Sequence, residues 1–305
     1  MQRVNSKIFD IDEWKKASEN FGIPRIAIVG YAGAGKSLLI NSLFGAKVAR
    51  VNARAGWTVV PQYVEHEFLE LIDTPGFGSD GWEETLFLQE IIEPADLLLH
   101  LINGASGVTD YDKEVYEMVG SHPGLLVALN KVDLLDEEEC WQAKEGVLSA
   151  LPLDSKELLL ISAKKGIGLD SVVARMIEIL PYSMKSSFVG ALSGDKFTKE
   201  REALAREMVH YYAKIAAAIA CIPIPIADLA LLAPLQIAMF LHVSRIFGHK
   251  YSKQQGASVI ASLLGSIGAR TAAQSIVSLF KGIPGLGSLL GSLAGGSMAY
   301  ATFEA

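Results

Sequence analysis

The chain has 305 residues, half of them hydrophobic, and a formal net charge of −7; its mean hydropathy is +0.30. This length suffices for one large or two ordinary domains. The acidic balance argues against general nucleic-acid binding. The two cysteines, Cys140 and Cys221, match no metal or redox spacing, which favours a reduced cytosolic compartment. Met1–Phe9 lacks the pattern of a signal peptide, so we expect a cytoplasmic protein.

The chain begins with a candidate amphipathic helix over residues 1–22. Ile8, Ile11, Trp14 and Ala17 recur at helical spacing, which predicts one apolar face that docks on another element.

Residues 23–182 alternate short apolar runs with amphipathic stretches, and this alternation predicts a mostly parallel sheet with helices on both faces. The six predicted strands lie near 24–29, 63–66, 68–72, 96–102, 125–129 and 158–161. Helices are predicted near 37–44, 82–93, 110–121, 136–149 and 168–180. Only the strands at 63–72 are close enough for an antiparallel hairpin. The expected fold class is therefore α/β.

Four short strings follow the predicted strands, where open α/β sheets bind ligands. The first, GYAGAGKS, spans Gly30–Ser37 and lies between a strand and a helix. Its backbone amides and the helix N-terminus are suited to a β-phosphate. Lys36 is expected to bridge the β- and γ-phosphates, and the Ser37 hydroxyl to bind Mg²⁺.

The second string, DTPG, spans Asp73–Gly76. Asp73 is placed to hold Mg²⁺ and the Gly76 amide to contact the γ-phosphate, so hydrolysis would release the loop that follows. Thr58 is the only threonine in 46–70, and it is the candidate to complete the Mg²⁺ shell. A surface threonine beside Trp57 is the alternative interpretation.

The third and fourth strings, NKVD at Asn130–Asp133 and SAK at Ser162–Lys164, favour a guanine base. A carboxylate at Asp133 can accept hydrogen bonds from the N1–H and the 2-amino group of guanine, whereas adenine offers no such donor pair. Asn130 would tie this loop to the phosphate loop, and the Lys131 stem would lie against the base. The Ala163 amide is expected near guanine O6.

In these strings, residues of about 25–180 resemble an Era-like small GTPase of the translation-factor-related class. The resemblance implies binding of GTP or GDP with Mg²⁺ and hydrolysis of GTP. The nucleotide residues it implies are Gly30, Ala32, Gly33, Ala34, Gly35, Lys36, Ser37, Leu38, Asp73, Gly76, Asn130, Lys131, Asp133, Ser162, Ala163 and Lys164. The catalytic set is Lys36, Thr58 and Gly76, and the metal ligands are Ser37, Thr58 and Asp73.

Two positions depart from that resemblance. Many Era-like members carry asparagine where this chain has Gly33. Phe77 follows the DTPG glycine, where Ras-like proteins place a catalytic glutamine. A phenylalanine cannot orient water, so we expect slow intrinsic hydrolysis unless a partner or self-association supplies the missing group. His66, Asp80 and Glu83 are candidates to orient water, although solvated polar side chains of a loop are the favoured interpretation.

Beyond Pro181 the composition changes. Residues 183–198 are rich in Ser, Gly and Lys, which predicts a linker. Residues 199–305 then predict a hydrophobic all-α domain. Residues 190–305 contain ten basic and six acidic residues, against 17 and 28 in residues 1–189.

This second region resembles an uncharacterised hydrophobic domain that follows Era-like GTPase domains in bacteria. The resemblance depends mainly on the Pro-Ile-Pro-x-x-Asp string at 223–228 and on Gln236. Residues 215–244 and 257–303 could contact or enter a bilayer. Their Ser, Gly and Pro content, with Pro234 among them, equally suits a soluble bundle. Asp228 is either a helix cap or a buried functional carboxylate.

Three hypotheses follow for the whole chain. The first is a slow GTP switch that controls a helical domain at the cytoplasmic membrane. The second is a membrane scaffold that forms homo-oligomers under control by GTP. The third is a ribosome or RNA assembly factor, which the acidic N-terminal half counts against.

Overall fold

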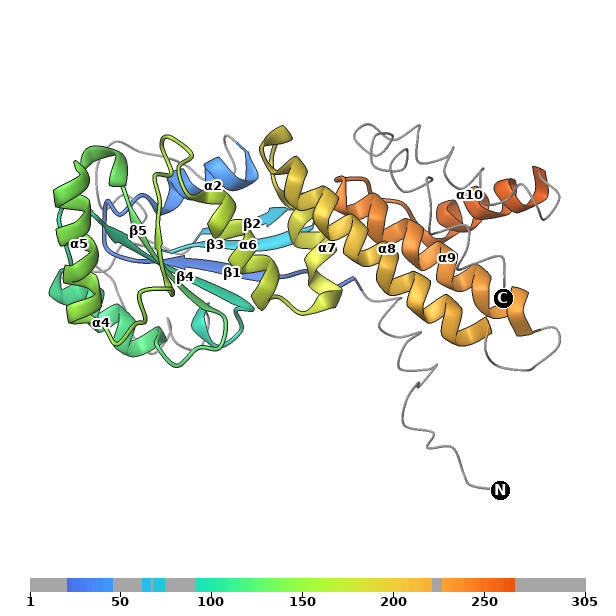
Figure 1. Cartoon of the computed structure of the whole chain (residues 1–305), viewed down its shortest axis with the longest axis horizontal. Coiled ribbons are helices and arrows are strands. Elements are labelled where there is room, and N and C mark those ends of the chain that lie inside the picture. Colours follow the sequence, from blue (N-terminus) through green and yellow to red (C-terminus); the bar gives the residue numbers. More distant parts are fainter. Residues whose placement is uncertain (1–20, 46–61, 67, 75–90, 221–226, 267–305) are drawn as a thin grey trace, which may run out of the picture. The chain divides into compact units, whose positions relative to one another are not determined.

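The computed structural model describes residues 21–45, 62–66, 68–74, 91–220 and 227–266. The chain divides into two compact units (Figure 1). The sheet unit spans Ile23–Phe197, and the helical unit combines the N-terminal residues with Thr198 onward.

The sheet unit contains the predicted six-stranded sheet. Its strands, in chain order, are β1 (Arg25–Val29), β2 (Gln62–His66), β3 (Leu69–Asp73), β4 (Leu97–Asn103), β5 (Leu125–Asn130) and β6 (Leu158–Leu160). Their order in the sheet is β2-β3-β1-β4-β5-β6. β2 pairs antiparallel with β3, and the other pairings are parallel. The α/β class and the hairpin are therefore confirmed.

Burial on both faces explains why the central strands are apolar almost throughout. Every residue of β4 from Leu97 to Ile102 is buried, and β5 is buried after its first residue. The register places Ile28 beside Asp73 and Asn103 beside Asn130. The carboxyl ends of β1, β3, β4 and β5 therefore meet at one edge of the sheet.

Helices cover both faces of this sheet (Figure 1). They are α2 (Lys36–Phe44), α4 (Asp110–Val119), α5 (Glu137–Ala150), α6 (Leu169–Ile179) and α7 (Tyr182–Ala191), with short 3₁₀ turns η2 (Val132–Leu134) and η3 (Asp195–Phe197). Capping boxes at Thr109 and Asp136 define the starts of α4 and α5. The helix predicted at 82–93 falls mostly outside the described residues.

One face of the sheet carries a buried polar pair that no sequence pattern predicted. His100 on β4 and Asp112 on α4 are both fully or nearly buried, and their Nε2 and Oδ1 atoms lie 3.8 Å apart. Burial raises the pKa of Asp112, but His100 and two bonds from Thr109 outweigh it, so the pKa of this carboxyl is lowered. Asp112 therefore stays ionised within the interface between α4 and the sheet.

The segment predicted as a linker, 183–198, differs in structure from that expectation. Most of it forms α7 and η3, and α7 buries six consecutive residues from Ser186 to Ala191. The Phe188 ring packs edge-on against Phe44 of α2, with centroids 6.2 Å apart. The small residues Ser186, Ser187 and Gly190, which the composition associates with linkers, are among the buried residues of this helix. The two units meet in the chain at Phe197 and Thr198.

The helical unit contains α8 (Thr198–Ala220), α9 (Ala227–Ile246) and α10 (Lys253–Ser266). α8 and α9 run side by side (Figure 1). α8 buries a stripe at helical spacing through Leu204, Ala205, Met208, Val209 and Tyr212. The helical class is confirmed, and α9 continues through Pro234.

A buried polar contact joins α8 to α9. The Tyr212 hydroxyl hydrogen-bonds His242 Nδ1. Burial, followed by the charge of nearby Arg245, lowers the pKa of His242 to about 4. His242 is therefore neutral at physiological pH, which lets it sit in this apolar interface.

Several sequence predictions lie outside the described residues: most of the helix at 1–22 and the apolar segment at 282–303. Asp228 is in the first turn of α9; its role as a helix cap or as a buried functional carboxylate remains a prediction. Within the residues described, no helix is both long enough and apolar enough to cross a membrane.

The burial of α7 leads to a stability prediction. Phe188→Ala should lower the free energy of unfolding by about 3–5 kcal/mol, because it leaves a cavity beside Phe44. Trp141→Ala is the control, since Trp141 is 63% exposed in the same unit, and its effect should stay within about 0.5 kcal/mol. Urea unfolding followed by circular dichroism measures both. Equal effects would contradict the packing of α7.

Candidate nucleotide-binding site

The loop from Gly30 to Gly35 connects β1 to α2, and two glycines allow its path. Gly30 has φ of +145°, and a Cβ there would lie 2.3 Å from the Leu101 carbonyl oxygen. Gly35 has φ of +99°, and a Cβ there would lie 2.5 Å from Asn130 Nδ2. The loop is therefore pressed against β4 and against the end of β5 in a way that only glycine permits.

Lys36 begins α2 and lies over this loop. Its side chain is 92% buried, being 8% exposed. Its Nζ donates to the carbonyl oxygen of Gly30 at 2.8 Å and to that of Tyr31 at 3.3 Å. The ammonium group is thus held inside the curve of the loop, beside the amides that could bind a phosphate.

The adjacent strand end is tied to β1. Thr74 is buried, and its hydroxyl donates to the Ile28 carbonyl at 2.8 Å. Asp73, the last residue of β3, pairs in register with Ile28. Asp73 and the phosphate loop therefore lie at the same sheet edge, and Ser37 follows in the first turn of α2. We did not predict the structural role of Thr74, although it belongs to the DTPG string.

Asn130, at the end of β5, joins three loops. Its Nδ2 donates to the Ala34 carbonyl of the phosphate loop at 2.8 Å. Its Oδ1 accepts from the Ala163 amide of the SAK loop at 2.9 Å. Asn130 is 1% exposed, so both bonds are shielded from water. The predicted link between the NKVD loop and the phosphate loop is present in the structure.

Ser162 positions the carboxylate of Asp133. Its hydroxyl donates to Asp133 Oδ1 at 2.6 Å and accepts from the Lys165 amide at 3.0 Å. The bond from Ser162 is the main reason that the pKa of Asp133 is lowered. Asp133 is therefore ionised at neutral pH. The predicted contact with two donors of guanine needs an ionised carboxylate.

Lys131 connects the base-side loop to β5 through an unusual backbone. It has φ of +68° and precedes η2; a non-glycine residue rarely adopts this conformation. Burial is the main reason that its pKa is lowered, against the opposing effect of Asp133. Such a conformation directs the NKVD loop back across the sheet edge.

The SAK loop shows one difference from expectation and one unpredicted contact. The Ala163 amide, predicted to face guanine O6, here donates to Asn130; the contact with O6 stays a prediction. The Ala163 carbonyl accepts from the Ser42 hydroxyl of α2 at 2.7 Å. No pattern in the sequence marked Ser42, a polar residue in the middle of a helix. Lys164 is exposed beside this loop.

The predicted residues thus divide into two groups. The structure brings together the loops that contain Gly30–Leu38, Asn130–Asp133 and Ser162–Lys164, with the end of β3 at the same edge. Thr58, Gly76 and Phe77, together with Asp80 and Glu83, lie outside the described residues. His66 is at the end of β2.

The donor chemistry at this edge fits a magnesium ion. Serine hydroxyl and aspartate carboxylate oxygens, as predicted for Ser37 and Asp73, are ligand types that Mg²⁺ prefers; their binding of the ion stays a prediction. Magnesium sites use few protein ligands and complete the shell with water and phosphate. The described residues contain no cluster of three or more His, Cys, Asp or Glu that could hold a metal ion.

The parallel sheet, the glycine-rich loop before α2 and the NKVD and SAK loops at one edge define a P-loop GTPase. Comparison with known proteins identifies the family. Residues 25–131 match the family model described as 50S ribosome-binding GTPase. Residues 185–302 match a domain of unknown function, DUF697. The chain therefore carries an Era/EngB/Der-like GTPase domain followed by a DUF697 domain.

Individual relatives resemble mainly the GTPase domain. The chain is 28% identical to the probable GTP-binding protein EngB of Mycoplasmoides gallisepticum, over 51% of this chain and 88% of that protein. It is 32% identical to GTPase Der of Clostridium novyi, over 52% of this chain and 37% of that protein. Among solved structures, a variant of Era from Aquifex aeolicus bound to GDP·AlF₄⁻ is 24% identical, with a TM-score of 0.43, over 64% of this chain and 67% of that one.

The two bonds of Asn130 lead to a prediction for nucleotide affinity. Asn130→Ala should weaken GDP binding about 10–100-fold, because it leaves two buried backbone groups unpaired and frees the loops. Asn103→Ala is the matched control: Asn103 lies beside Asn130 in the sheet, and its side-chain oxygen accepts from the Ala105 amide in its own exposed turn. Fluorescent GDP titration measures both variants. An equal loss of affinity in the two would contradict the role of Asn130.

Proposed function

We propose that this protein is a slow, GTP-controlled switch whose nucleotide state governs its helical unit. The observation that carries the proposal is the contact of Asn130 with both the phosphate loop and the SAK loop. This contact couples the phosphate end of the site to the base end. One bound nucleotide that spans both ends would then order all three loops together.

At the phosphate end, backbone amides of Gly30, Ala32, Gly33, Ala34, Gly35, Lys36, Ser37 and Leu38 are proposed to surround the α- and β-phosphates. Lys36 would exchange its carbonyl contacts for the β- and γ-phosphate oxygens, a short movement because its ammonium group already lies in the loop. Ser37, Asp73 and Thr58 are proposed to hold Mg²⁺, which neutralises charge on the phosphates when bound.

At the base end, Asp133 is proposed to accept from guanine N1–H and the 2-amino group. The bond from Ser162 occupies Oδ1 and fixes the carboxylate plane. The stem of Lys131 would cover one face of the base, while Ala163 and Lys164 form the loop near O6. The lowered pKa of Asp133 supports this role, since only an ionised carboxylate accepts both bonds.

Hydrolysis is proposed to be slow. Gly76 and Thr58 would sense the γ-phosphate, and loss of that phosphate would release their loops. Phe77 follows Gly76 and cannot orient the attacking water. The helical unit is proposed to respond to this release at the cytoplasmic face of a membrane, through residues 215–244 and 257–303. A scaffold that self-assembles in the GTP state would use the same surfaces.

The rate of hydrolysis tests the switch. Dilute full-length protein with Mg²⁺ should hydrolyse GTP at about 10⁻⁴–10⁻³ per second, as expected for a GTPase without its activator. Turnover per molecule should rise with protein concentration if self-association supplies the missing group. Phosphate release measured over a hundredfold range of concentration gives both values. Fast turnover at the lowest concentration would contradict the proposal.

Base specificity tests the site itself. Asp133→Asn should weaken GDP binding at least about a hundredfold and create a preference for xanthosine diphosphate, because the amide can donate to the xanthine 2-oxygen. Asp136→Asn is the matched control, since Asp136 is three residues away and caps α5. Competition between the two nucleotides measures the preference. Unchanged specificity in Asp133→Asn would show that another residue reads the base.

A further inference from the structure

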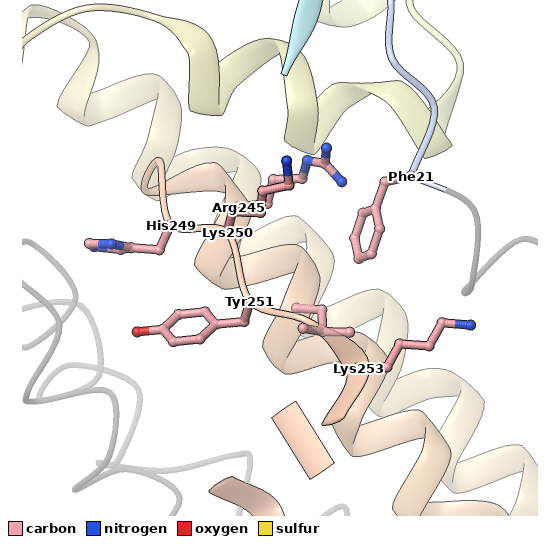
Figure 2. Close-up of a pocket in the computed structure, with 7 residues that line it drawn as sticks. Phe21, Arg245, His249, Lys250, Tyr251 and Lys253 are labelled. Atoms are coloured by element: carbon pink, nitrogen blue, oxygen red, sulfur yellow. The ribbon is translucent and has the colours of Figure 1, made fainter. Parts of the chain in front are cut away.

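The helical unit contains a pocket that the GTPase site does not use. Its volume is about 210 Å³. Figure 2 shows the residues that line it, which come from the end of α9, the connection to α10, the start of α10 and the segment before β1: Phe21, Leu241, Arg245, His249, Lys250, Tyr251 and Lys253.

Local backbone structure builds this pocket. Gly248 has φ of +76° and ends α9. The His249 amide donates to the Ser244 carbonyl at 3.0 Å and the Gly248 amide to the Arg245 carbonyl at 2.9 Å, the two bonds of a Schellman motif. This motif reverses the chain at a fixed angle. Residues 249–253 therefore return to one defined place beside α9.

The start of α10 is fixed as firmly. Ser252 and Gln255 form reciprocal bonds of 2.8 and 3.2 Å between side chain and backbone, the pattern of a capping box. Gly256 then packs closely on α9, since a Cβ there would lie 3.2 Å from a Leu241 methyl carbon. The walls of the pocket are thus set by the same bonds that end α9 and begin α10.

The described residues that line the pocket include three basic side chains. They are Arg245, Lys250 and Lys253, which lie together with His249, and none of the lining residues in the described part of the chain is acidic. The surrounding sequence has the same bias: residues 229–303 contain five lysines and arginines and no aspartate or glutamate. The whole chain has a net charge of −7. The pocket can be basic in this acidic chain because most of the acidic residues lie in the sheet unit.

Aromatic contacts orient two of these residues. The guanidinium carbon of Arg245 lies 4.6 Å from the centre of the Phe21 ring, a cation–π contact that fixes the plane of the fork. The Tyr251 ring packs on Phe240, with centroids 5.2 Å apart. Figure 2 shows Arg245, Lys250 and the Phe21 ring among the residues that line the pocket.

We propose that this pocket binds a phosphate group carried by a small polar molecule, such as glycerol phosphate or the headgroup of an anionic phospholipid. A planar guanidinium can form two parallel bonds to phosphate oxygens, and a lysine adds a point charge. Phe21 and Tyr251 would contact the carbon atoms that carry the phosphate. The proposal concerns the helical unit alone and does not depend on the function proposed for the nucleotide site.

The test uses the full-length protein with its nucleotide site saturated by Mg²⁺ and GDP, so that added phosphate cannot occupy the P-loop. Inorganic phosphate and glycerol 3-phosphate are titrated by calorimetry at constant ionic strength. In a parallel arm, vesicles of phosphatidylglycerol or of phosphatidylcholine are sedimented with the protein. The variant is Lys250→Gln with Lys253→Gln; both lysines are exposed. Lys214→Gln, an exposed lysine on α8, is the control.

We expect saturable binding in at least one arm, weakened at least about tenfold in the double variant and within about twofold of wild type in Lys214→Gln. Binding to free phosphates alone assigns a soluble ligand. Binding to phosphatidylglycerol vesicles that glycerol 3-phosphate displaces assigns a lipid headgroup. A variant with Lys250→Arg, used instead of the two glutamine substitutions, should keep most of the wild-type affinity. Because it retains the positive charge, it separates loss of charge from loss of fold.

Two results would overturn the proposal. One is the absence of saturable binding by the wild-type protein in both arms. The other is binding that the double variant retains, or that Lys214→Gln weakens equally, because the anion would then be bound elsewhere on the chain. Circular dichroism of each variant confirms that α8, α9 and α10 are intact.

Discussion

The side chain of Asn130 is the interaction on which the site depends. The loops that must act on one nucleotide follow three different strands, and nothing in the sheet alone holds them together. Two bonds, to the Ala34 carbonyl and the Ala163 amide, connect them inside a region closed to water. Gly35 can pass this close only because it lacks a Cβ. The glycine-rich loop and the asparagine therefore form one unit, although 95 residues separate them in the sequence.

The sequence predicted a residue's role correctly where that role follows from adjacent residues in the chain. Alternating apolar runs predicted the six strands, and the four strings predicted which loops meet at the sheet edge. It failed where a role depends on distant partners. The buried pair of His100 and Asp112 and the contact of Ser42 with Ala163 need the fold before they can be seen. The segment 183–198 looked like a linker because its residues are small and polar, yet Ser186, Ser187 and Gly190 are buried in α7.

The helical unit is stabilised differently from the sheet unit. Its core depends on apolar stripes along α8 and α9, and a neutral His242 bonded to Tyr212 provides the polar link between them. Three of its cations, Arg245, Lys250 and Lys253, line the pocket where α9 turns into α10. If this pocket binds phosphate as proposed, the chain has one phosphate site made from backbone amides at a helix start and another made from side chains at a helix end. Such an arrangement would allow a nucleotide and a second phosphate-bearing ligand to act on one molecule.

The central claim is that this chain selects guanine through loops held by Asn130. The most direct test measures the dissociation constants of GDP and ADP for the wild-type full-length protein, with Mg²⁺ present, by competition against a fluorescent guanine nucleotide. The account predicts that GDP binds at least about a thousandfold more tightly, since adenine lacks the donor pair for Asp133 and would leave its carboxylate unpaired. Comparable affinities for the two nucleotides would contradict it.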